Sequence, residues 1–168
     1  IELGTAALLV MFYHYWLATY GAGAWVPLVA GIIIAVMMVI LFAYDAKWFL
    51  LPDVIIFPLI AIGCMVAIAT IVTSTDPVAT MFSVAGALLI LSGLYLALWL
   101  ISSGQWIGFG DVKLGLALGL LLSDYQLAFL ALFLANLLGV VIVLPALLTK
   151  KISRKTHVPF GPLLIAGF

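Results

Sequence analysis

Long apolar segments with almost no charge dominate this chain of 168 residues. Hydrophobic residues make up 68% of the sequence and charged residues 7%, and the mean hydropathy is +1.44. Soluble domains contain roughly 45–50% apolar residues, and a helix that is apolar on every side has no face for water. Runs of about 17–25 apolar residues are long enough to cross a hydrocarbon core as helices. The sequence therefore predicts an all-α protein, a polytopic bundle of membrane helices.

Turn-forming residues divide the apolar sequence into six predicted helices and the start of a seventh. These helices cover residues 3–20, 26–44, 54–73, 78–101, 112–123 and 127–148, and the last begins at Val158. We expect a single transmembrane domain over residues 1–168, because no linker is long enough to hold another domain. We also expect both ends to be truncated, since the chain begins with Ile1 and its last apolar run is too short to span a membrane.

The predicted helix over residues 112–123 is unusually short. It would span about 18 Å at 1.5 Å per residue, against roughly 30 Å of hydrocarbon. Backbone that is not helical is stable at membrane depth only inside protein or beside a wet cavity. Either the loop that contains the sequence GFGD enters the membrane, or this short helix is held inside the bundle.

Positive charge predicts the orientation of the helices, because cytoplasmic loops carry the excess of Lys and Arg. If the first helix starts inside, the loops at 45–53, 102–111 and 149–157 are cytoplasmic. All basic residues fall in or beside these three loops: Lys47, Lys113, Lys150, Lys151, Arg154 and Lys155. We therefore expect a multi-pass membrane protein in which these three loops share the cytoplasmic face.

Nucleic-acid and metal sites are not expected. The net charge is zero, and the chain has no basic surface for nucleic acid. The single cysteine, Cys64, has no second thiol for a disulfide or a zinc knuckle, and we expect it to be a small buried residue. His14 and His157 are predicted on opposite sides of the membrane, where they cannot share a metal ion.

Two acidic residues, Asp45 and Asp111, stand apart from the others. Each follows a long apolar run on the predicted cytoplasmic side, and each is followed two residues later by a lysine. Residues two apart do not share a helix face, so Lys47 and Lys113 can extend toward the headgroups while the carboxylates face inward. Ionisable residues at membrane depth are costly and usually functional. We therefore expect these two aspartates to meet in one site.

The remaining acidic residues have ordinary explanations. Asp76 and Asp124 lie in predicted turns on the opposite face. Asp53 precedes a predicted helix, and we favour a capping role over a catalytic one. For Glu2, a supporting polar contact and a simple interfacial position both stay open.

A pair of carboxylates in a site of low dielectric constant suits the hydrolysis of a peptide bond. Two such groups cannot both ionise easily, so one keeps its proton. The charged carboxylate can activate a water while the protonated one polarises the scissile carbonyl. Gly108 and Gly110 beside Asp111 would permit unusual backbone dihedral angles and leave room for a substrate strand. Asp45 and Asp111 are therefore candidate catalytic residues.

Two other functions are compatible with the same residues. A small cation- or proton-coupled transporter would bind or relay its ion at Asp45 and Asp111. The acids of a relay should lie at several depths, however, and these two are predicted at one edge of the membrane. A structural component of a secretion assembly would leave both acids unused.

Two segments carry a resemblance to a known family. YDAKWFLLPD at residues 44–53 and GFGDVKLGLALG at residues 108–119 resemble the signature segments of the prepilin peptidases, or type IV leader peptidases, which are GxGD intramembrane aspartyl proteases. The opening IELGTAALL and the closing PFGPLLIAG are also similar to that family. The resemblance thus covers nearly the whole chain.

This resemblance implies that Asp45 and Asp111 are the catalytic pair and that Gly108 and Gly110 shape the active-site loop. Lys113, in the same loop, could contact substrate or a lipid phosphate, although a side chain that extends toward the headgroups is the simpler expectation. The resemblance implies no cofactor for peptide cleavage.

The resemblance also implies a substrate and a location. The substrates would be type IV prepilins or the pseudopilins of type II secretion, whose basic leader peptide is cleaved after a glycine at the cytoplasmic face of the bacterial inner membrane. Many family members also N-methylate the new terminus, using an upstream zinc segment with paired CxxC motifs. This sequence shows no such segment, which leaves methyltransferase activity undecided.

Overall fold

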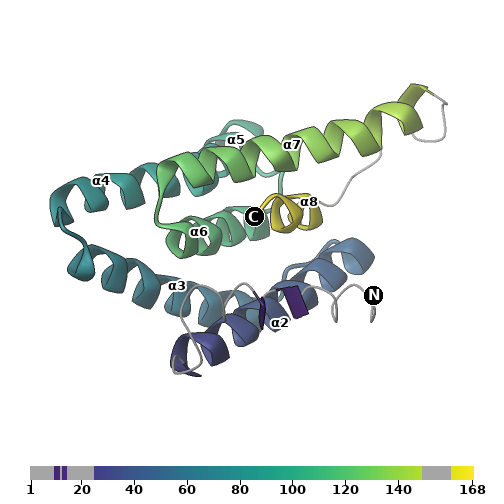
Figure 1. Cartoon of the computed structure of the whole chain (residues 1–168). Coiled ribbons are helices and arrows are strands. Elements are labelled where there is room, and N and C mark those ends of the chain that lie inside the picture. Colours follow the sequence, from purple (N-terminus) through teal and green to yellow (C-terminus); the bar gives the residue numbers. More distant parts are fainter. Residues whose placement is uncertain (1–9, 12, 15–24, 149–159) are drawn as a thin grey trace. The chain divides into compact units, whose positions relative to one another are not determined.

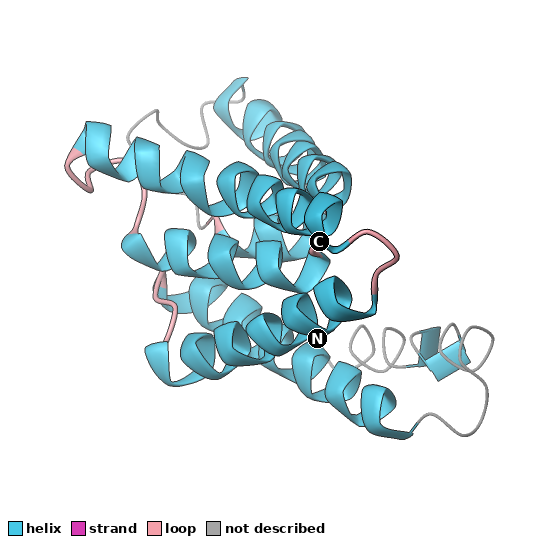
Figure 2. Ribbon diagram, turned by 90° about the vertical axis from the view of Figure 1, so that its left-hand side faces the viewer, coloured by secondary structure: helices cyan, strands magenta, loops and turns pink. Residues whose placement is uncertain are grey.

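The structure, a computed structural model, describes residues 10–11, 13–14, 25–148 and 160–168. Every secondary-structure element in these ranges is a helix (Figure 2). The elements are α2 (Trp25–Trp48), α3 (Asp53–Thr73), α4 (Pro77–Leu88), the π-helix η1 (Leu89–Gly93), α5 (Leu94–Ser102), α6 (Phe109–Leu122), α7 (Tyr125–Leu148) and α8 (Gly161–Gly167). The predicted all-α helical bundle is confirmed.

The candidate site residues all belong to one compact unit, residues 41–168, while residues 1–40 form another. Most of the predicted helix over residues 3–20, together with Glu2 and the basic loop at 149–157, lies outside the described residues. In the unit of residues 41–168, α4, η1 and α5 follow one another without a break and together correspond to the helix predicted over residues 78–101. The π-helical segment inside this helix was not expected from the sequence.

Four described helical segments are long and apolar enough to cross a membrane: Leu28–Trp48, Asp53–Thr73, Pro77–Ser102 and Tyr125–Leu144. Many of their large apolar side chains, such as Val54 and Phe82, are exposed on the surface of the protein. Lipid tails are as apolar as these side chains, so a membrane protein gains little by burying them. Cys64 is exposed in α3 for the same reason, and its predicted burial is wrong.

The short helix α6 is the centre of the compact unit. It packs against α3, α4, η1, α5, α7 and α8, and Figure 1 shows it between α3 and α7. Its buried residues are spread around the helix: Val112, Leu114, Gly115, Ala117, Leu118, Gly119 and Leu120. Of the two alternatives for this segment, the structure therefore supports a helix held inside the bundle.

Two glycines allow α6 to approach its neighbours closely. A Cβ atom added at Gly115 would overlap the backbone carbonyl oxygen of Leu91 in η1, and one at Gly119 would lie 3.1 Å from the carbonyl oxygen of Ala87 in α4. In the same region the Ser92 hydroxyl donates a hydrogen bond of 3.1 Å to the carbonyl oxygen of Val112. Helices in lipid associate through close van der Waals contact and hydrogen bonds of this kind.

Replacing Gly115 with Ala should destabilise the fold by about 1–3 kcal/mol, the usual cost of overpacking, because the new methyl group would overlap the backbone of η1. Gly93→Ala is a matched control, since its Cβ atom would make only ordinary contacts, the nearest with Leu89 Cδ2 at 3.5 Å. Unfolding of both variants in detergent measures the difference. Equal stabilities would show that the position of α6 does not depend on this contact.

Candidate active site

Asp45 lies in the last turn of α2, and its side chain is buried, with 5% of its surface exposed. The sequence analysis ended this helix at Tyr44, which was wrong because the following residues continue it to Trp48. The helix stops where Phe49 takes a left-handed φ of 54° and its N–H donates to the Asp45 carbonyl oxygen at 3.0 Å. A residue in this conformation is a common helix stop. The carboxylate is therefore held by a regular helix.

The Asp45 carboxylate accepts a hydrogen bond of 2.9 Å from the backbone N–H of Gly161, the first residue of α8. A Cβ atom at Gly161 would lie only 2.6 Å from the carboxylate oxygen Oδ2 of Asp45. A glycine is therefore needed here for the hydrogen bond to form without displacing the carboxylate. No role was predicted for Gly161. Its place in the closing segment PFGPLLIAG is the one signal in the sequence that points to it.

Asp111 lies in the first turn of α6 and is half-buried. This helix begins at Phe109, three residues before the predicted start, and the Phe109 ring packs against Trp99 with 5.3 Å between ring centroids. The Asp111 N–H donates to the Gly108 carbonyl oxygen at 3.1 Å. Both candidate carboxylates thus belong to helix ends rather than to the loops beside them.

The two glycines of the GFGD segment differ in their surroundings. Gly108 has a φ of −73° and a ψ of 146°, which any residue can adopt, and Gly110 is helical, so the expected unusual dihedral angles are not found. A Cβ atom at Gly110 would lie 3.1 Å from Leu51, whereas one at Gly108 would meet only the Asp111 carboxylate at 3.7 Å and the Gly110 nitrogen at 3.9 Å. Gly110 therefore admits Leu51, and Gly108 leaves open space beside Asp111.

The two carboxylates interact electrostatically. Burial, and to a smaller extent the negative charge of Asp45, together raise the pKa of Asp111 to about 7, and a hydrogen bond with the Gly108 backbone opposes part of this rise. The meeting of the two acids in one site stays a prediction. With a pKa of about 7, Asp111 can hold a proton near neutral pH.

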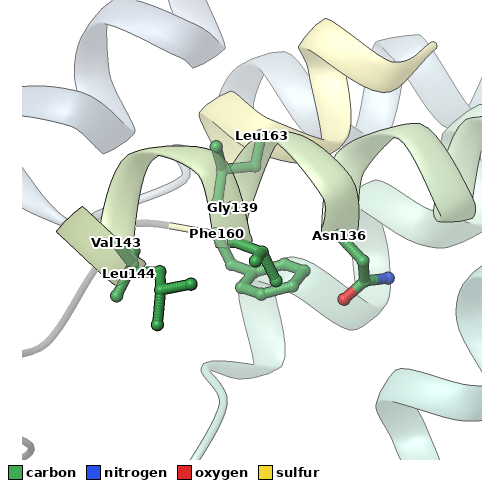
Figure 3. A pocket seen from close by; sticks show the side chains of 7 residues that line it. Asn136, Gly139, Val143, Leu144, Phe160 and Leu163 are labelled. Carbon is green, nitrogen blue, oxygen red and sulfur yellow. The ribbon is translucent and has the colours of Figure 1, made fainter. Parts of the chain in front are cut away.

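An apolar groove lies between α7 and the start of α8. It has a volume of about 390 Å³ and is lined by Asn136, Gly139, Val140, Val143, Leu144, Phe160 and Leu163. Figure 3 shows the Phe160 ring beside α7, between Asn136 and Leu144. Phe160 immediately precedes Gly161, and its ring also meets the buried Tyr95 edge to face, with 5.6 Å between centroids. The groove is thus linked to Asp45 through Phe160, which precedes the glycine that donates to this carboxylate.

Lys113 and Asp53 form an ion pair with each other. Asp53 is the first residue of α3, and the N-cap position is occupied by Pro52 without any side-chain hydrogen bond. The predicted capping role of Asp53 is therefore wrong, because its carboxylate lies one residue too late and reaches across to α6. Lys113 was expected to extend toward the headgroups, or to contact substrate or a lipid phosphate. None of these expectations included Asp53 as its partner.

Asp76 and Asp124 are structural, as expected. Asp76 accepts a hydrogen bond of 3.0 Å from the Ala79 N–H and caps α4. Asp124 accepts hydrogen bonds of 2.8 Å and 2.9 Å from the N–H groups of Gln126 and Leu127 at the start of α7. Both carboxylates serve the helix ends at which they lie.

Residues 32–144 match the model of the type IV leader peptidase family. The chain belongs to this family. It is 29% identical, over its whole length, to a prepilin leader peptidase/N-methyltransferase of Pseudomonas aeruginosa, of which it covers 55%. It is also 35% identical to a prepilin leader peptidase/N-methyltransferase of Klebsiella pneumoniae over 71% of this chain and 49% of the relative. The chain thus spans about half the length of these curated family members, and no solved structure matches it.

The raised pKa of Asp111 predicts that the fold loses stability as the pH rises. The pKa of about 7 in the folded protein lies above the ordinary value of 3.8, so the folded chain binds this proton more tightly than the unfolded chain. The resulting stabilisation is complete below pH 3.8 and is lost as the pH rises through about 7. Asp111→Asn should remove it.

Thermal unfolding in detergent between about pH 4 and about pH 8 measures this effect. The melting temperature of Asp111→Asn should rise relative to that of the wild-type protein as the pH increases, and the difference should level off above the folded-state pKa. A difference in melting temperature between the two proteins that stays the same at every pH would contradict the assignment of a raised pKa to Asp111.

Proposed function

We propose that this chain is an aspartyl endopeptidase that cleaves the leader peptide of type IV prepilins or pseudopilins. The proposal is supported by the buried Asp45, whose charge contributes to the raised pKa of the half-buried Asp111, in a chain of the type IV leader peptidase family. The proposed cleavage follows a glycine at the cytoplasmic face of the bacterial inner membrane. Topology from the basic residues supports that face.

The surroundings of the two carboxylates support different chemical roles. The Gly161 N–H donates to Asp45 and so stabilises its ionised form. Asp111 has a pKa of about 7, because of burial and the charge of Asp45, and can hold a proton near neutral pH. Asp45 is therefore the proposed general base and Asp111 the proposed general acid.

The proposed reaction needs only these two groups and a water. Asp45 takes a proton from the water, and the oxygen of that water bonds to the scissile carbonyl carbon. At the same time Asp111 gives its proton to the carbonyl oxygen. The tetrahedral intermediate then collapses: the C–N bond breaks, the proton on Asp45 passes to the leaving amine, and a hydroxyl proton returns to Asp111. Both carboxylates end the cycle in their starting states.

The open side of Gly108 supports access of a peptide to Asp111, since nothing but the carboxylate and a backbone nitrogen lies within contact of that position. The groove beside Phe160 offers apolar surface to a hydrophobic segment of the substrate. Lys113 is neutralised by Asp53, so its charge does not oppose a basic leader. These features suit a substrate with a basic stretch followed by an apolar one.

Membership of a peptidase family favours hydrolysis over cation transport, the alternative for the same two aspartates. N-methylation is part of the name of the relatives, of which the matched residues make up about half. We propose only the peptidase activity for the residues described.

Asp45→Asn and Asp111→Asn should each lower cleavage by about 10²–10⁴-fold, because each removes one participant in proton transfer. The assay uses the protein in liposomes with a peptide that carries a basic leader, a glycine and an apolar segment. Thermal unfolding verifies that each variant is folded. Cleavage at the wild-type rate by both folded variants would rule out the proposed mechanism.

Gly161→Ala should also reduce cleavage, because its methyl group would displace the Asp45 carboxylate from a position 2.6 Å away. We expect a fall in kcat of about 10²-fold, the effect of a misplacement of about 1 Å. Gly93→Ala is the control, because its Cβ atom would make only ordinary contacts, the nearest with Leu89 Cδ2 at 3.5 Å, and it lies outside the proposed site. Similar kcat values for the two variants would show that the contact is not needed.

A further inference from the structure

We propose that Asp53 and Lys113 are positioning residues whose ion pair fastens the start of α3 to the start of α6 and thereby holds Asp45 and Asp111 together. The inference rests on the proposed peptidase function and adds two residues that act through the carboxylates rather than on the substrate. Three contacts carry it: two join the start of α3 and the connection before it to α6, and the third joins that connection to Asp45.

The first contact is the ion pair and its apolar surroundings. The Lys113 side chain is 19% exposed, and its ammonium group pairs with Asp53. The same ammonium lies over the rings of Phe57 in α3 and Phe109 in α6, at 5.5 Å and 5.7 Å from their centroids. Aromatic faces attract a cation and shield this side of the pair from water. The lysine therefore has a defined position between the two helices.

The second contact is steric and lies next to the first. Leu51 packs against the backbone of Gly110, where an added Cβ atom would be only 3.1 Å from the Leu51 side chain. Gly110 immediately precedes Asp111, and Leu51 lies two residues before Asp53. The connection between α2 and α3 is thus attached to the first turn of α6 at two neighbouring points.

The third contact joins this connection to Asp45. Only four residues, 49–52, separate α2 from α3, and the Phe49 N–H donates to the Asp45 carbonyl oxygen at 3.0 Å. The left-handed φ of 54° at Phe49 reverses the chain directly after the helix turn that contains Asp45. A short, hydrogen-bonded connection transmits the position of α3 to the end of α2.

These contacts connect one carboxylate to the other through a continuous series of bonded and contacting residues. The path runs from Asp45 through the reversal at Phe49 to Asp53, across the ion pair to Lys113, and back two residues along α6 to Asp111. If the ion pair is broken, the Leu51 contact and the packing of α3 against α6 remain, but the start of α3 loses its charged contact with α6. The two carboxylates then lose part of the constraint on their separation, and proton transfer depends steeply on that separation.

Lys47 offers a natural comparison. It also stands two residues after a candidate carboxylate, but its ammonium lies over the ring of the adjacent Trp48, 4.5 Å from the centroid. Within the part of the chain that the structure describes, it makes no ion pair. Loss of the Lys47 charge therefore reports the effect of removing a lysine near the site without breaking a link between helices.

Charge exchange tests the positioning role. Asp53→Asn and Lys113→Met should each lower kcat for the prepilin-like peptide by roughly ten- to a hundredfold with little change in KM, because the carboxylates are misplaced while the peptide surface is intact. Lys113→Arg, which keeps the charge, should retain most of the activity, and so should Lys47→Met. The exchange Asp53→Lys with Lys113→Asp should recover at least tenfold in kcat over either half of the exchange alone.

Three outcomes would overturn the proposal. An exchange variant no more active than its single halves would remove the ion pair as the cause, and a rise in KM without a fall in kcat for Lys113→Met would assign Lys113 to the substrate. If kcat falls in proportion to thermal stability in all variants, the ion pair only stabilises the fold and does not position the carboxylates. Failure of the peptidase function itself is distinguishable, since then wild type, Asp45→Asn and Asp111→Asn would not differ in cleavage.

Discussion

The close packing of α6 against the surrounding helices is the constraint on which the rest of the structure depends. This helix is too short to cross a bilayer, yet it is buried on all sides, and the backbone at Gly115 touches the backbone of η1. Lipid supplies no hydrophobic force between helices, so such contacts decide where α6 lies. They place Asp111, in its first turn, at a fixed point in the protein.

The same packing creates the electrostatic character of the site. Apolar neighbours reduce the solvation of the Asp111 carboxylate, and the nearby charge of Asp45 makes a second charge still less favourable. The protein treats the two acids unequally: a backbone N–H supports the charge on Asp45, while the open side of Gly108 leaves Asp111 accessible. This inequality is what acid–base chemistry by two identical side chains requires.

Much of the fold was predictable, because apolar length and turn residues decide where membrane helices lie. The predicted bounds of α3 and α7 differ from the observed ones by no more than two residues. The bounds near Asp45 and Asp111 were wrong because each acid was read as a helix boundary, whereas the backbone at Phe49 and Gly108 decides where the helices end. The Asp53–Lys113 pair was missed because pairing between helices depends on their packing, which no local pattern encodes.

The hydrogen bond from Gly161 to Asp45 has a consequence for how such a protein can vary. Its donor is an atom of the main chain, so among single substitutions only proline, which has no N–H, deletes it. Truncation to alanine would register only the bulk that is introduced at this position, and never the absence of the donor. Tolerance at Gly161 therefore depends on the size of the side chain and on whether the backbone N–H is kept.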